Sequence, residues 1–286
     1  DLPKDLPAEL ILGYHLIFYP DWLDFYRDDR AALKQKFGSL EVTASFYGGL
    51  GPDTLLEQYR ADLRRAVNLG ARYVVFHVSD VSLEEGYTYR WLHTNQEVID
   101  AAVEVVNLIL GEERWPFEFL VENQWWPGFT FTEPEETARL LEGIRFAGKG
   151  ILLDTGHLMN ACTELKTEAE GADYIRRMLN RHGSLAKWVR GVHLHQSLSG
   201  AYVKAHTGSL PAGLPEDYME RFGVSYQHIL QIDQHRPWTD PAILSVLEQI
   251  EPRYLTHELS SRGRMARAEA VSVQTRLLQQ GGRMRV

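Results

Sequence analysis

The chain has 286 residues and a formal net charge of −9, and its hydrophobic share of 44% and charged share of 24% are ordinary for a folded protein with a sizeable core. No stretch is apolar over the thickness of a bilayer, and the opening DLPKDLPAEL lacks the pattern of a signal peptide, so we expect a cytoplasmic protein without membrane contact. The acidic balance argues against nucleic acid as a partner but does not exclude it, since bound divalent cations add positive charge locally.

Short apolar runs alternate with amphipathic segments along the whole sequence. The runs have the length and composition of buried strands, and the segments between them have the apolar spacing of helices. Strands are expected at 9–16, 40–47, 71–78, 116–123, 151–154, 188–197, 228–235 and 254–259. Helices are expected at 21–37, 53–70, 95–110, from 134 onward, and at 171–183, 240–250 and 262–280.

This alternation occurs about eight times without a break in composition. It predicts an α/β fold of one domain over residues 1–286, a (β/α)8 TIM barrel closed by its outer helices. An open doubly wound sheet is the main alternative, but no glycine-rich dinucleotide turn follows the first strand. The segment from Leu198 to Gln227 is the longest irregular connection, which is typical of a lid or an insertion.

Ligand-type side chains collect at the ends of the expected strands. ILLDTGH, residues 151–157, ends in Asp154, a glycine that permits a sharp turn, and His157. A carboxylate and an imidazole at one rim can face a divalent cation, although Asp154 could instead cap a helix while His157 fills a polar corner. The only cysteine, Cys162, cannot form a disulfide framework or a cysteine-based zinc site, so nitrogen and oxygen are the expected ligands.

Four further strands end in such residues, and barrels build their sites at the carboxyl ends of their strands. Two carboxylates or more with an imidazole suit Mn, Co, Mg or Zn. The sequence predicts one ion held by Glu122, Asp154, His193 and Glu258. The IDQH motif adds Asp233 and His235, which would share one face of a strand. A second ion is expected on residues drawn from His77, His157, Asp233 and His235.

Other side chains are candidates to line the site. His195 points the same way as His193 along a strand, so either could be the ligand. His15 ends the first strand and could line the cavity or serve as a hydrogen-bonded structural residue. The aromatic rings after Glu122 could cover a sugar or form an oligomer contact. The residues expected to line the substrate are His15, Tyr47, Trp125, Trp126, His195 and Trp238.

In their order along the chain, the motifs LVEN, LLDTGH, GVHLHQS, IDQH and HE resemble those of the xylose isomerase-like superfamily. These barrels include sugar isomerases, epimerases and apurinic endonucleases that resemble endonuclease IV. The resemblance spans about Leu12 to Glu258. It implies that the first set of four residues binds the catalytic metal, and that His157 binds substrate oxygen, as in the epimerases, or a further zinc, as in the endonucleases. It matches His77, Asp233 and His235 to other zinc ligands of the endonucleases.

The sequence departs from both branches of the superfamily. The endonucleases carry a second-strand histidine where this chain has Tyr47. Ketose epimerases carry an arginine and a glutamate where this chain has Ser199 and Gly128. No single subfamily is therefore matched, and the substrate cannot be transferred from one.

Three functions are compatible with these residues. The first is a metal-dependent isomerase or epimerase, or a related lyase, that acts through an enediolate on a small polyhydroxy carbonyl compound. Glu122 and Glu258 would move the proton, and His157 would hold the carbonyl oxygen. The second is a multi-zinc phosphoesterase of the apurinic endonuclease type. The third is a noncatalytic metal-binding barrel. A small-molecule substrate is the expected partner, and a homo-oligomer is compatible with the sequence.

Overall fold

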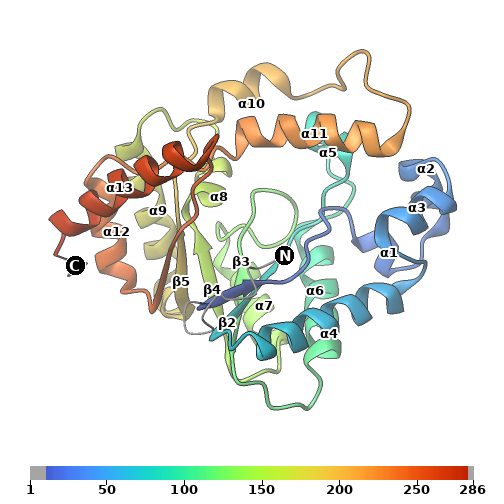
Figure 1. The fold of residues 1–286 in the computed structure, drawn as a ribbon, viewed down its shortest axis with the longest axis horizontal. Helices are drawn as coiled ribbons and strands as arrows, with labels where there is room; N and C mark the ends of the chain where they lie inside the picture. Colours follow the sequence, from blue (N-terminus) through green and yellow to red (C-terminus); the bar gives the residue numbers. More distant parts are fainter. Residues whose placement is uncertain (1–10, 283–286) are drawn as a thin grey trace.

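The computed structural model describes residues 11–282, and within this range one parallel sheet runs through the protein (Figure 1). The opening DLPKDLPAEL lies outside the described residues. The strands follow one another in the sheet in chain order, each parallel to the next. They are β1 (Gly13–His15), β2 (Tyr73–His77), β3 (Glu118–Glu122), β4 (Lys149–Asp154), β5 (Val189–Leu194) and β6 (Tyr254–His257).

Helices fill the connections between these strands. They are α1 (Leu23–Tyr26), α2 (Arg30–Phe37), α3 (Leu40–Tyr47), α4 (Pro52–Asn68), α5 (Leu83–Thr88), α6 (Asn95–Leu110), α7 (Pro134–Gly143), α8 (Thr155–Asn160), α9 (Glu168–His182), the 3-10 helix η2 (Gly183–Trp188), α10 (Gly200–His206), α11 (Tyr218–Ile232), α12 (Ala242–Ile250) and α13 (Arg264–Gln280). None of these helices is long and apolar enough to cross a membrane.

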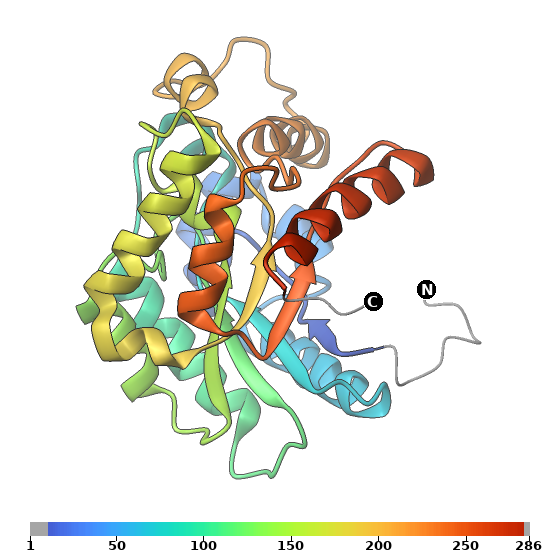
Figure 2. The same cartoon turned by 90° about the vertical axis from the view of Figure 1, so that its left-hand side faces the viewer.

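The sheet is curled, with helices on its outer face (Figure 2). Tyr73 on β2 and Thr256 on β6 are not neighbours in the sheet, yet their hydroxyl oxygens lie 3.1 Å apart. The ring of Tyr73 also packs on that of Tyr254, at 4.4 Å between centroids. Inward-facing side chains of β2, β3, β4 and β6 therefore form a small core inside the curl. The larger core lies between the sheet and the outer helices.

The structure describes six strands where the sequence predicts eight. Residues 40–47, a predicted strand, form helix α3. The apolar run is too short to distinguish the repeat of a helix from that of a strand. Residues that cap both ends of the segment favour the helix. The side chain of Ser39 accepts a hydrogen bond from the backbone N–H of Val42, and Gly48 ends the helix in the left-handed conformation with φ of 79°.

Because residues 40–47 form a helix, Tyr47 lies away from the site. Its ring stacks on Phe25 with 3.8 Å between centroids, and its hydroxyl donates to the backbone oxygen of Asp21. Tyr47 is almost fully buried in the core beneath α1 and α3. The expectation that it lines the substrate is therefore wrong.

The second missing strand is the expected one at 228–235. Helix α11 begins at its cap, Asp217, and continues to Ile232, so most of this segment is helical. The residues after it run in an irregular path in which His235 has a φ of 47°. One antiparallel bridge between Gln196 and Arg236 ties this path to the chain beyond β5. The expected irregular stretch from 198 to 227 holds α10 and the start of α11, which Figure 1 shows across the upper end of the sheet.

Candidate metal centre

The site lies at the carboxyl ends of the strands, where the strand register places ligand-type side chains next to one another. His77 at the end of β2 is paired with Glu122 at the end of β3. Asp154 at the end of β4 is paired with His193 on β5. Because parallel strands end at the same edge, these four side chains meet there.

The first group of side chains is the predicted set of four: Glu122, Asp154, His193 and Glu258. Their ligand atoms all lie within 4.8 Å of one another. Nδ1 of His193 lies 3.3 Å from Oε1 of Glu122 and 2.5 Å from Oε2 of Glu258. The same nitrogen is 3.9 Å from Oδ2 of Asp154. Three of the four side chains are buried. That of Glu258 is 29% exposed, so the group is accessible from the cavity side.

Asp154 fills both of the roles that the sequence left open. Its Oδ1 accepts a hydrogen bond of 2.6 Å from the backbone N–H of His157 and so caps α8. Its Oδ2 faces the site and lies 2.8 Å from Nε2 of His195. Asn123 holds the Asp154 backbone through two hydrogen bonds, which fixes the direction of this carboxylate.

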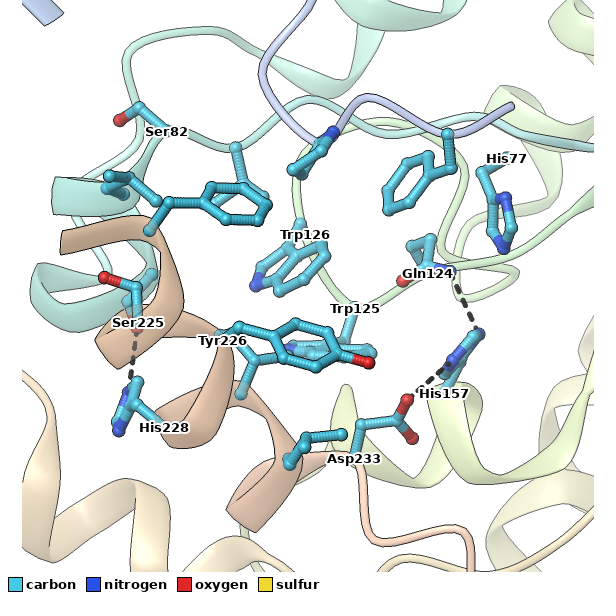
Figure 3. A pocket seen from close by; sticks show the side chains of 18 of the residues that line it. His77, Ser82, Gln124, Trp125, Trp126, His157, Ser225, Tyr226, His228 and Asp233 are labelled. Carbon is cyan, nitrogen blue, oxygen red and sulfur yellow. Dashed lines mark hydrogen bonds and ion pairs between the residues drawn. The ribbon is translucent and has the colours of Figure 1, made fainter. Parts of the chain in front are cut away.

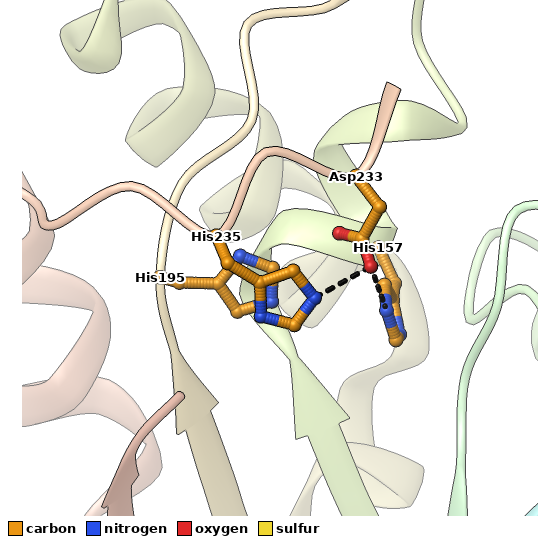
Figure 4. A group of neighbouring side chains, drawn as sticks. All are labelled: His157, His195, Asp233 and His235. Carbon is orange, nitrogen blue, oxygen red and sulfur yellow. Dashed lines mark hydrogen bonds and ion pairs between the residues drawn. The ribbon is translucent and has the colours of Figure 1, made fainter. Parts of the chain in front are cut away.

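The second group joins His157, His195, Asp233 and His235 (Figure 4). Oδ2 of Asp233 lies between two imidazoles, 2.6 Å from Nε2 of His235 and 3.3 Å from Nε2 of His157. The rings of His195 and His235 stack with 4.0 Å between centroids. The sequence places His195 among the lining residues and, through its spacing to His193, also leaves it open as a ligand. The structure brings it into this group.

The third group joins His15 and His77 to Glu122. Nε2 of His77 lies 3.2 Å from Oε2 of Glu122, and Nδ1 of His15 lies 4.0 Å from the same oxygen. His77 therefore lies with Glu122 and not with Asp233, which corrects the expected second set. His15 lies where its imidazole can complete a ligand set, because β1 is paired with β2 and ends at the same rim.

Electrostatics keep Glu122 and Asp233 ionised. Burial alone would raise the pKa of the Glu122 carboxyl, but the nearby imidazoles of His77 and His193 lower it to about 2. The pKa of Asp233 is lowered, against its burial, by His157 and His235. Burial lowers the pKa of His77 to about 4, so that imidazole is neutral near pH 7. The carboxylates around His157, His193 and His235 instead raise the pKa of these imidazoles against their burial, that of His235 to about 9, so a divalent cation bound there would displace their protons.

Unpartnered atoms test whether these residues fit metal ions. Within residues 11–282, Oδ1 of Asp233 and Nδ1 of His195 are buried without a hydrogen-bond partner. Oε2 of Glu122 is buried too and makes no hydrogen bond, although it faces His77. Buried polar atoms without partners are costly, and an ion would satisfy them. The nitrogen and oxygen donors fit Zn, Mn, Co or Mg.

A cavity of about 480 Å³ opens beside the three groups (Figure 3). Trp125 and Trp126 line it, as do His77, His157 and Asp233 from the metal groups. Trp238, by contrast, is not among the described residues that line it. Its indole N–H donates to the backbone oxygen of His195 at 2.8 Å, and the ring is fully buried in the main core. Trp238 thus supports His195 from behind, which corrects its expected role.

Known proteins are similar to the chain at the level of fold. The family model described as xylose isomerase-like TIM barrel matches residues 8–272. No curated protein matches in sequence. A crystal structure of a D-tagatose 3-epimerase-like protein is 16% identical, covers 96% of this chain and 82% of its own, and has a TM-score of 0.51.

Two other solved structures are similar at lower scores. Endonuclease IV from Thermus thermophilus is 15% identical over 94% of this chain and 99% of its own, with a TM-score of 0.46. Mannonate dehydratase from Streptococcus suis is 12% identical over 96% of this chain and 95% of its own, with a TM-score of 0.47. At such identities the likeness concerns the fold, and function has to be argued from the site.

Proposed function

This chain belongs to the xylose isomerase-like TIM barrel family, and from that premise we propose that it is a hydrolase that cleaves a phosphate ester with two or three divalent ions. The observation that carries the proposal is that its ligand-type side chains form the three adjoining groups described above, while a fourth combination, His15, His193 and Glu258, overlaps the first and the third. A single ion is enough to polarise a carbonyl and a neighbouring hydroxyl. Several ions close together are suited to in-line displacement at phosphorus.

Shared carboxylates link the groups. Oε1 of Glu122 faces His193 in the first group, while its Oε2 faces His77 in the third. Oδ2 of Asp154 lies 3.9 Å from His193 and 2.8 Å from His195, which belongs to the second group. Glu122 directs one oxygen toward each of two groups and would serve as a ligand in both, whereas Asp154 directs Oδ2 alone toward both and uses Oδ1 to cap α8. This arrangement supports a multinuclear centre.

Hydrogen bonds behind the groups orient the imidazoles. Nδ1 of His157 lies 3.0 Å from the backbone oxygen of Asn123, and Nδ1 of His235 lies 3.0 Å from that of Glu258. Donation from Nδ1 to these oxygens fixes the direction of both rings, and Nε2 of each ring then donates to Oδ2 of Asp233. An ion bound at this group would replace those Nε2 protons.

Each part of the site has a task in such a reaction. Divalent ions, when bound, supply Lewis acidity to phosphoryl oxygens and lower the pKa of water. The three groups would hold those ions, because half of their side chains are buried and hydrogen bonds to the backbone orient Asp154, His157 and His235. Glu258, at the open side of the first group, would accept a proton from the attacking water. The aromatic walls of the cavity exclude bulk water from the reacting ester.

Phosphoester cleavage by paired variants tests the proposal. Protein loaded with Zn or Mn should cleave simple aryl phosphate monoesters or diesters, and a chelator should abolish the activity reversibly. Asp233→Asn should remove the second group's only carboxylate and most of the activity. His257→Gln is the matched control, because His257 bonds to Gln274 away from the groups and should keep wild-type metal content and rate. Full activity in Asp233→Asn, or none in the wild type with any ester, would contradict the proposal.

One observation supports an isomerase or epimerase as a second candidate function. Glu122 and Glu258 come from different strand ends and both approach Nδ1 of His193. Two carboxylates around one ion could take a proton from carbon and return it. Metal-loaded protein incubated with ketoses in deuterated water would then incorporate deuterium, and Glu258→Gln would not. Exchange without ester cleavage would favour this candidate over hydrolysis.

A further inference from the structure

We infer that the cavity beside the metal groups binds a flat aromatic ring that carries a hydrogen-bond acceptor, so that the substrate is the phosphate ester of such a ring-bearing alcohol. The ester part rests on the proposed function. The ring part rests on the cavity alone.

The walls of the cavity are mainly aromatic and aliphatic. Six aromatic rings line it: Phe18, Tyr87, Trp125, Trp126, Phe222 and Tyr226. Among the described residues, no lysine or arginine lines it. A polyol would bury several hydroxyl groups there without partners, at a cost for each one. A planar ring would instead gain offset or edge-to-face contacts with the walls, and a volume of about 480 Å³ suits a small ligand of this kind.

Three unpartnered polar atoms indicate what the ring should carry. The indole N–H groups of Trp125 and Trp126 and the hydroxyl of Ser225 are buried and have no hydrogen-bond partner within residues 11–282. Figure 3 shows these three side chains on the wall of the cavity. The indole N–H can only donate, so it needs an acceptor on the ligand.

The other polar groups of this wall are already engaged. Nδ1 of His228 lies 3.0 Å from the hydroxyl of Tyr202, and its Nε2 lies 3.2 Å from the backbone oxygen of Gly86. Nε2 of Gln124 lies 3.1 Å from Nδ1 of His157. The polar requirement of the cavity is therefore small: an acceptor for the indole N–H groups of Trp125 and Trp126, with Ser225 able to donate or accept.

The ring would be attached to the reacting group. His157, Asp233 and His235 of the second group line the same cavity as the aromatic residues. The ring of Phe18 packs on His77 at 4.4 Å, and that of Trp125 packs on His157 at 5.2 Å. The aromatic walls thus begin at the metal ligands themselves, and a phosphate held at the ions would place its esterified group directly against these rings.

Ring binding is tested first without any phosphate, on the full chain stripped of metal. Dissociation constants are measured by calorimetry for phenol, 4-hydroxyacetophenone, cyclohexanol and adenosine. Phenol should bind about 2- to 10-fold more tightly than cyclohexanol, as expected for aromatic contacts. 4-Hydroxyacetophenone, which adds a carbonyl acceptor, should bind about fivefold more tightly than phenol. Adenosine binding as tightly as 4-hydroxyacetophenone or tighter would identify the ring as a nucleobase, and weaker binding would identify it as a phenol.

Variants separate the ring contact from the hydrogen bond. Trp126→Phe keeps a ring but removes the N–H. It should therefore raise the dissociation constant of 4-hydroxyacetophenone about fivefold and leave that of phenol unchanged. Trp91→Phe is the control, because Trp91 is 40% exposed and does not line the cavity. Unchanged melting temperatures show that both variants fold. Equal binding of phenol and cyclohexanol, or a Trp126→Phe variant identical to wild type with every ligand, overturns the inference.

The corresponding phosphate esters then separate the inference from the proposed function. Ring binding without ester cleavage keeps the inference and removes the phosphoesterase proposal. Equal cleavage of phenyl and cyclohexyl phosphate, at equal KM, keeps the proposal and removes the inference.

Discussion

Replacing Gly156 by alanine tests how tightly the second metal group is built. Gly156 follows Asp154 in α8, and its backbone is not left-handed, so the turn itself does not require glycine. Space requires it. A Cβ atom added there would lie 2.0 Å from Cε1 and 2.3 Å from Nδ1 of His195. Since ordinary contacts begin at about 3.4 Å, the imidazole would have to move by roughly 1.4 Å.

His195 has little freedom to make that movement. Its ring stacks on His235 at 4.0 Å, and its Nε2 lies 2.8 Å from Oδ2 of Asp154. Overpacking of a filled site costs about 1–3 kcal/mol. For a chain of 286 residues that corresponds to a fall in melting temperature of roughly 2–5 °C. The displaced imidazole should also weaken metal binding at the second group.

Differential scanning calorimetry on two glycine variants measures this effect. Gly223 lies in the exposed face of α11 with open space around its Cα, so Gly223→Ala should raise the free energy of unfolding by about 0.5–1 kcal/mol. Gly156→Ala should lower it. If Gly156→Ala melts at or above the wild-type temperature, the packing of His195 against α8 is wrong and the geometry of the second group has to be abandoned.

Three further outcomes are expected. Glu122→Gln should lose more than one ion per chain by elemental analysis, because Glu122 faces two groups. Asp233→Asn should lose only one ion. Equal losses in the two variants would contradict the bridging role of Glu122. Asn123→Ala, which frees the Asp154 backbone, should weaken metal affinity by about 10- to 100-fold in competition with a chelator. The Asp24 carboxylate, 3.2 Å from Nε2 of His93, raises the pKa of that imidazole, so the folded protein binds that proton more tightly than the unfolded chain. This contribution to stability is complete below about pH 6.5 and is lost as the pH rises through the raised pKa, so His93→Gln should lower the melting temperature more at pH 5.5 than at pH 8.5.

Four of the six strands that the sequence predicted correctly, β2 to β5, are largely buried, whereas β1 and β6 are only partly buried. Runs such as YVVFH at 73–77 have no helical period and lie inside the curl, so composition and burial agree. LEVTASFY at 40–47 carries the same residue types, but the Ser39 and Gly48 caps make it a helix. HILQIDQH at 228–235 continues a helix that begins at Asp217, well before the short run that resembles a strand. Short apolar runs do not contain the information that separates these cases.

Ligand positions were easier to predict than the elements that carry them. Strand ends share one rim, so a histidine or a carboxylate there meets its counterparts whatever the details of the helices. The D-x-H spacing of Asp233 and His235 was argued from a strand that is absent, yet the irregular path after α11 brings both to the second group. The sequence could not assign the ligand-type side chains to separate groups. His15, His77 and His195 belong to other groups than expected, because the grouping depends on sheet curvature and side-chain rotamers.

Counting the bound ions in place tests the central claim most directly. Crystals of protein loaded with zinc or manganese should show two or three anomalous scattering peaks. One should lie among Glu122, Asp154, His193 and Glu258, one beside Asp233 and His235, and the third, where present, between His15 and His77. A single peak in the first group, with Asp233 and His235 contacting only protein or water, would contradict the multinuclear hydrolase and leave the single-ion isomerase chemistry as the better account.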